Sequence, residues 1–287
     1  MPMKPFTTLI VCLLLATPAL ANDSLVSALK AVDERDYERA IENLTKLSES
    51  QQDRDMLFHL ARVQYQSGDF DRAADTLKDF HQLYPNDGEA YYLSGLVYLA
   101  LIVEVNIFKK VGMANKALSS WKASVAADPS NLDSRYAIFA FYTNAPGIAG
   151  GDLNIAKEQM KEIEQLDSAY GAMAKGLLLS KEKDEAGAET AFQKAAILMN
   201  RAGPYFSLAQ FYMQTEQYEK AISSVQQFRA REKRWWDPDV TVTYLVIARA
   251  NAELGNIEVA RKEAELGLSM NPNKQTKKLL NKILKSL

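Results

Sequence analysis

The sequence predicts an all-α protein, a right-handed superhelical solenoid of about seven helix pairs that ends in a C-terminal capping helix. The main observation is an alanine that recurs at intervals of 32 to 44 residues, usually shortly after a turn residue. Composition agrees, because good helix formers predominate and the 287 residues include only 13 Gly and 9 Pro. No apolar alternation typical of strands is found. The recurring alanines are Ala40, Ala73, Ala117, Ala156, Ala188, Ala221 and Ala260.

Residues 54–87 form the clearest repeat unit. It resembles the tetratricopeptide repeat, in which small residues recur at fixed places and a proline often comes near the end of the unit. The resemblance covers nearly the whole chain after about residue 24 and implies stacked helix pairs, because one pair alone cannot bury its apolar faces. Segments 108–118 and 142–156 further resemble a group of exported bacterial tetratricopeptide proteins. The matching residues of the unit are Leu57, Leu60, Ala61, Gly68, Phe70, Ala73, Leu77, Phe80 and Pro85.

Residues 1–21 have the pattern of a secretory signal peptide. Lys4 precedes an apolar stretch, and small residues at Ala19 and Ala21 predict cleavage after Ala21. The apolar stretch is too short for a comfortable membrane span. Cys12 raises the alternative of a lipoprotein, although it lies inside the apolar stretch rather than at the expected cleavage point. The expected domain division is therefore a signal peptide at 1–21 and one solenoid domain at 22–287.

The cysteine content indicates the compartment of the protein, and the charge balance indicates its class of partner. Cys12 is the only cysteine, so a mature chain that starts at Asn22 can form no disulfide. An exported helical protein without disulfides suits a bacterial periplasm better than a eukaryotic secretory route. The 34 basic and 36 acidic residues nearly balance, and we expect neither a nucleic-acid partner nor a membrane span.

The repeat period is interrupted at residues 99–117, where an apolar helical stretch continues beyond Tyr98. One interpretation is a longer first helix that packs on its neighbour. The other is an apolar patch for a partner, including a homodimer contact through residues 99–113.

A second interruption contains the glycine-rich segment 144–152. Phosphate-binding loops follow a strand and end in Gly-Lys-Ser or Gly-Lys-Thr, whereas this segment joins two helices and ends in Gly-Gly-Asp. We therefore expect a structural role, with Pro146 stopping one helix and Asp152 capping the next.

A third interruption contains Trp235-Trp236-Asp237-Pro238, close to Arg231, Lys233 and Arg234. The two tryptophans are interpreted as a cover for the seam between repeats, with an interaction site as the alternative.

Residues 274–287 predict a final amphipathic helix. Leucine and isoleucine recur at helical spacing up to Leu287, and four lysines accompany them. Because the last repeat of a solenoid needs a cover for its open face, this segment is interpreted as a capping helix. A basic helix that lies on an anionic membrane is the alternative.

The sequence carries no catalytic signature, so we expect a non-enzymatic protein without catalytic residues, metal site or cofactor. The only histidines are His59 and His81, which lack metal-ligand spacing, and no nucleophile or metalloprotease motif occurs.

The resemblance to tetratricopeptide repeats implies that the first helix of each pair lines a concave groove. Tyr, Phe and Arg dominate protein recognition, so the inward positions predict a groove for a protein or peptide. The alternative is that a tightly wound superhelix buries these side chains against one another. The predicted groove residues are Phe58, Arg62, Tyr65, Tyr92, Tyr136, Tyr170, Met173, Phe206, Met213, Leu245 and Arg249.

Two functions follow from these patterns. The leading hypothesis is a periplasmic scaffold that binds a protein segment in its concave groove. The alternative is a carrier of a small or lipidic ligand that partners a solute-uptake or envelope transport system, which an apolar pore lined by Leu96, Leu99 and Ile102 would favour.

Overall fold

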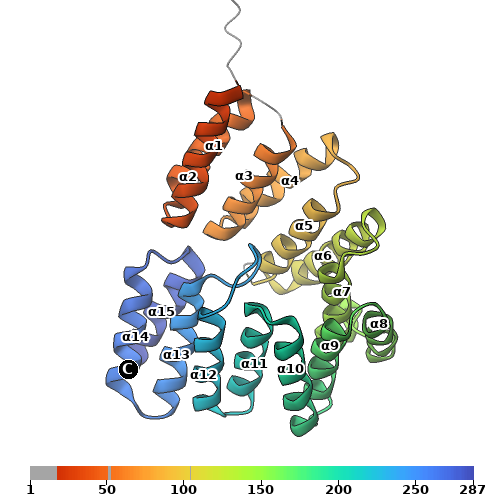
Figure 1. Ribbon diagram of the computed structural model, residues 1–287, viewed down its shortest axis with the longest axis vertical. Helices are drawn as coiled ribbons and strands as arrows, with labels where there is room; N and C mark the ends of the chain where they lie inside the picture. The colour runs from red at the N-terminus through yellow and green to blue at the C-terminus, as the bar shows by residue number, and fades with distance from the viewer. Residues whose placement is uncertain (1–17, 51–52, 104) are drawn as a thin grey trace, which may run out of the picture.

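The computed structural model describes residues 18–50, 53–103 and 105–287, and the regular elements of these residues are all helical (Figure 1). Residues 1–17 of the expected signal peptide lie outside the described residues. The helices in chain order are α1 (Pro18–Asp33), α2 (Tyr37–Ser50), α3 (Arg54–Ser67), α4 (Phe70–Leu83), α5 (Gly88–Leu101), α6 (Ile107–Ala127), α7 (Leu132–Asn144), the 3-10 helix η1 (Gly147–Ala149), α8 (Leu153–Leu166), α9 (Ser168–Lys181), α10 (Glu185–Met199), α11 (Ala202–Gln214), α12 (Tyr218–Arg229), α13 (Val240–Glu253), α14 (Ile257–Ser269) and α15 (Lys274–Ser286).

Helices α1 to α14 form seven successive pairs, and α15 follows as a single helix, which confirms the predicted solenoid. Each recurring alanine lies on the second helix of its pair, and all seven have no exposed surface. Two helices approach closely only where the facing side chains are small. The alanine period therefore marks the contact line of each pair.

Short polar side chains begin most of the helices. The Asp69 carboxylate accepts a hydrogen bond from the backbone N–H of Arg72, and the Asp87 carboxylate accepts one from Ala90. Such caps satisfy backbone donors that have no partner inside the helix. They fix where each helix starts and so set the spacing between repeats.

The first interruption lengthens the second helix of its pair, so the interpretation as a longer first helix is wrong. Helix α5 ends at Leu101, and the Asn106 side chain starts α6 by accepting a hydrogen bond from the Lys109 N–H at 3.2 Å. Helix α6 has 21 residues, whereas α5 has 14. A local cap thus divides what the sequence presents as one continuous apolar stretch.

The glycine-rich segment has the structural role that was predicted for it. Helix α7 ends at Asn144, and Asp152 caps α8 by accepting hydrogen bonds from Asn154 and Ile155. Gly150 has φ of 95°, which favours glycine. At Gly151 a Cβ would lie 1.8 Å from the Ala145 carbonyl oxygen, so the two backbone segments approach too closely for any side chain.

The C-terminal helix covers the last pair. Leu280 is fully buried and Ile283 nearly so, and both belong to a cluster with Ala248 of α13 and Ala264 of α14. The predicted capping helix is therefore present, with its apolar side turned to the solenoid.

The solenoid curves until its first and last repeats meet (Figure 1). The Arg35 Nε lies 3.2 Å from the Asp239 carboxylate, and the Asn271 side chain donates a hydrogen bond to the Arg35 carbonyl oxygen at 2.6 Å. The Asn273 side chain donates to the carbonyl oxygen of Gln66 at 3.2 Å. These contacts join the α1–α4 region to the segments on either side of α13 and α14.

Candidate binding site

The segment between α12 and α13, residues 230–239, crosses the concave side of the solenoid; we call it the inner loop (Figure 1). Trp235 packs edge-on against Phe58, with ring centroids 5.8 Å apart. Its indole N–H donates a hydrogen bond to the Glu89 carboxylate at 3.2 Å, and the Gln66 side chain donates to the Trp235 carbonyl oxygen at 3.2 Å. The inner loop is thereby bound to α3 and α5.

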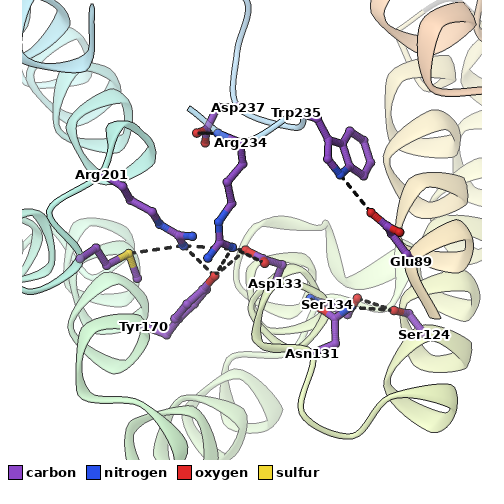
Figure 2. Close-up of polar contacts among 11 residues, drawn as sticks. Glu89, Ser124, Asn131, Asp133, Ser134, Tyr170, Arg201, Arg234, Trp235 and Asp237 are labelled. Carbon is purple, nitrogen blue, oxygen red and sulfur yellow. Dashed lines mark hydrogen bonds and ion pairs between the residues drawn. The ribbon is translucent and has the colours of Figure 1, made fainter. Parts of the chain in front are cut away.

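A cluster of ionic and phenolic groups holds the other side of the inner loop (Figure 2). The Arg234 guanidinium donates hydrogen bonds to the Asp133 carboxylate at 2.7 Å and to the Tyr170 hydroxyl at 3.1 Å. The Tyr170 hydroxyl donates to Asp133 at 2.6 Å and accepts from Arg201 at 2.7 Å. Four elements, α7, α9, the inner loop and the residue before α11, therefore meet at one hydrogen-bonded centre.

Burial sets the protonation behaviour of this cluster. Desolvation raises the pKa of Asp133 above its ordinary value, although the hydrogen bond from Tyr170 and the positive charge of Arg234 act in the opposite direction. Burial and the neighbouring carboxylate also raise the pKa of Tyr170, so its hydroxyl keeps its proton and remains a donor. The cluster joins α7, α9, the inner loop and the residue before α11 through hydrogen bonds.

Beside the inner loop lies an apolar cavity of about 1060 Å³. Leu96, Leu99 and Ile102 line it, the three residues that the sequence associated with ligand carriage. The rest of its wall comes from α6, α7, η1, α9, α11 and the inner loop. Few polar groups reach it, and the charged ones are Lys110, Asp133, Arg201 and Asp237.

All three interruptions of the repeat meet at this cavity. The first contributes Phe108, the second Ile148 and the third Trp236. The curvature of the solenoid brings these segments together although they are far apart in the sequence. The cavity is therefore made by the residues that depart from the repeat, on a scaffold made by those that follow it.

Comparison with known proteins supports the fold assignment. Models of the tetratricopeptide repeat match residues 31–97 and 202–228. These two segments therefore match tetratricopeptide repeats. Its solenoid is similar to a tetratricopeptide repeat protein from Parabacteroides merdae, with a TM-score of 0.56 and 15% identity over 92% of this chain and 97% of that one.

Two further solved structures are similar to this chain. TTC0263 from Thermus thermophilus, a thermophilic protein of the same repeat class, has a TM-score of 0.50 and 16% identity over 82% of this chain and 98% of that one. A human IFIT1 dimer with m7Gppp-AAAA has a TM-score of 0.54 and 16% identity over 87% of this chain and 55% of that one. No curated protein sequence matches the chain.

The groove residues predicted from the sequence lie in several different environments in the structure. Phe58, Tyr92 and Tyr170 are buried, and each contacts the inner loop. Arg249 is exposed. Four members, Tyr92, Tyr136, Met173 and Phe206, line the apolar cavity. The half-buried members are Arg62, Tyr65, Tyr136, Met173, Phe206, Met213 and Leu245.

The predicted groove residues Tyr65, Met213 and Leu245 lie apart from the apolar cavity. Tyr65 lines a second, more polar cavity of about 630 Å³, on the side of the inner loop where Arg35 and Asn273 lie, and burial raises its pKa to about 12. Met213 packs against the α10–α12 cluster and Leu245 against the C-terminal one. The inner loop thus divides the concave side of the solenoid into two compartments.

Several residues of this site were not predicted from the sequence. Arg201 and Pro204 line the cavity from the start of α11, and Trp121 does so from α6. The basic residues beside Trp235 and Trp236 were the available signal, because an aromatic pair next to arginine suggests a loop that folds inward. Among the described residues, no group of three or more His, Cys, Asp or Glu side chains is placed to hold a metal ion. In the same part of the chain, no helix combines the length and apolar character needed to cross a membrane.

Proposed function

We propose that this protein is a non-catalytic binding protein of the bacterial periplasm that holds a small or lipidic apolar ligand in the cavity. The tetratricopeptide repeat fold suggests an interaction scaffold, and proteins of this family are generally non-catalytic. The observation that carries the proposal is the apolar cavity of about 1060 Å³ formed by the three interruptions. Ligand pockets are typically about 300–1,000 Å³, mostly apolar, with a few polar groups that orient the ligand.

The wall of the cavity matches a ligand with an apolar body. Leu96, Val111, Ala137 and Phe206 provide aliphatic and aromatic surface from α5, α6, α7 and α11. Burial of such surface stabilises a bound hydrocarbon by about 25 cal/mol per Å². Arg201 also lines the cavity, and its buried Nη1 has no hydrogen-bond partner among the described residues, so this nitrogen can orient a polar group of the ligand.

Filling the cavity should abolish ligand binding. Ala137 lines it and is only half-buried, so Ala137→Phe adds a ring that occupies ligand volume. We expect the affinity for a fluorescent fatty-acid analogue, measured by equilibrium titration, to fall about tenfold or more, which corresponds to about 1.4 kcal/mol. Ala126→Phe, on the exposed side of α6, is the matched control and should bind as the parent does.

Melting temperatures of both variants separate blocked binding from lost folding. A parent protein that does not bind the analogue, or an Ala137→Phe variant that binds it as tightly while folded, would contradict the proposed ligand class.

A protein segment is the second candidate occupant, favoured by the tetratricopeptide repeat fold, which suggests protein-interaction scaffolds. Its apolar side chains would then enter the same cavity. Competition distinguishes the two, because a synthetic apolar peptide that displaces the fatty-acid analogue at lower concentration than free palmitate would favour the protein segment.

The periplasmic part of the proposal predicts an exported protein that starts at Asn22. Its support is the order of Lys4, an apolar stretch and small residues at Ala19 and Ala21. N-terminal sequencing of protein from a bacterial envelope fraction should give Asn-Asp-Ser-Leu. A chain that begins at Cys12, or an uncleaved chain in the cytoplasm, would refute export by this route.

A further inference from the structure

The cavity has a rim of exposed apolar side chains. Phe108 and Ile148 line the cavity, yet 92% and 85% of their surface is exposed, and Leu99 is 48% exposed. Val103, four residues after Leu99 in the chain, is 68% exposed. Single exposed apolar residues are common, but several gathered at the mouth of an apolar cavity mark an interaction surface.

Positive charge accompanies this rim. Lys109 and Lys110 follow Phe108 directly, and Lys110 itself lines the cavity. The acidic residues that line the cavity, Asp133 and Asp237, both accept hydrogen bonds from Arg234, through its side chain and its backbone N–H respectively. Lys110 therefore lies at the rim, together with the most exposed apolar side chains that line the cavity.

We propose that this rim docks on the surface of an anionic lipid bilayer. Exposed Phe and Ile next to lysines match a lipid interface, where apolar side chains enter the acyl boundary and cations meet lipid phosphates. The inference rests on the proposed function, because a bilayer is the source from which an apolar ligand would reach the cavity without crossing water.

Charge argues for a bilayer over a second copy of the chain. A two-fold interface would bury the same patch of both copies, so it would bring two sets of Lys109 and Lys110 into one interface, where like charges repel. An anionic surface instead complements both lysines. The dimer is kept as an outcome of the experiment.

Vesicle sedimentation tests the proposal on the full chain as a bacterial host produces and processes it. The parent should bind vesicles that contain phosphatidylglycerol, and binding should weaken in pure phosphatidylcholine vesicles or at high salt. Phe108→Glu with Ile148→Glu should lower the vesicle-bound fraction about tenfold. Glu near the start of α6 suits the helix dipole, so folding should persist.

A matched pair of substitutions tests whether the location matters. Ile197 and Leu198 of α10 are 74% and 48% exposed and do not line the cavity. Ile197→Glu with Leu198→Glu changes charge and apolarity as the rim variant does, and should leave vesicle binding unchanged. Equal loss in both double variants, or no loss in the rim variant, would overturn docking through the rim.

Two further measurements keep this proposal separate from the proposed function. Titration of the parent with the fatty-acid analogue in solution measures ligand binding independently of vesicle binding. A parent that binds the analogue but no vesicle overturns the docking alone, whereas one that binds vesicles but no analogue overturns the ligand proposal. A parent dimer that the rim variant splits, with no vesicle binding, assigns the rim to a second copy and overturns bilayer docking.

Discussion

Replacing Phe58 with alanine should lower the free energy of unfolding by about 3–5 kcal/mol. Phe58 is only 3% exposed, and its ring centroid lies 5.8 Å from that of Trp235 and 6.5 Å from that of Phe80. Truncation would leave a void where α3, α4 and the inner loop meet. Urea denaturation followed by circular dichroism measures the change.

Phe108→Ala is the matched control for this substitution. It removes the same side chain from a position that is 92% exposed, so the free energy of unfolding should change by less than about 0.5 kcal/mol. If Phe58→Ala changed the free energy of unfolding as little as the control does, the inner loop would not cover Phe58 in solution. The prediction of an open groove would then hold.

Gly95→Ala should destabilise the protein by about 2–3 kcal/mol. A Cβ at Gly95 of α5 would lie 2.1 Å from the indole nitrogen of Trp121, which is 3% exposed and packs across this backbone. The indole would have to move, and with it part of the cavity wall. Because the loss in packing exceeds the usual gain in helix propensity, the melting temperature should fall.

Gly112→Ala should instead raise the stability of the protein. Gly112 lies within α6, and no atom comes within 4 Å of the place its Cβ would take. The exposed helix should gain up to about 1 kcal/mol. A Gly95→Ala variant that gains stability as Gly112→Ala does would show that Trp121 does not rest on α5.

The repeat architecture was predictable because its cause is local. Ala73 and Ala221 each occupy a contact line between two helices that are adjacent in sequence, so the period records the packing directly. The capping role of Asp152 was predictable for the same reason, since a cap concerns residues two or three positions away.

The candidate site was less predictable, because it depends on how strongly the solenoid curves. Nothing near Trp235 in the sequence indicates that its partners are Phe58 and Glu89. The interpretation of residues 99–117 as a longer first helix was wrong, since the apolar stretch after Tyr98 contains a helix boundary that the Asn106 side chain creates. From the sequence, a pore lined by Leu96, Leu99 and Ile102 could be named as the feature that would favour a ligand carrier. The curvature of the solenoid then brings these residues next to the other two interruptions.

The long reach of the inner loop has a consequence for the order of folding. Trp235 is joined by hydrogen bonds to Glu89 and Gln66, which are 146 and 169 residues away in the chain. Solenoids usually gain structure repeat by repeat through near neighbours, at a speed that low contact order permits. Here Phe58 and Tyr92 stay exposed to solvent until the inner loop, which follows the sixth helix pair, has been synthesised. The early repeats are therefore at their greatest risk of aggregation during synthesis, before the segment that completes them has emerged.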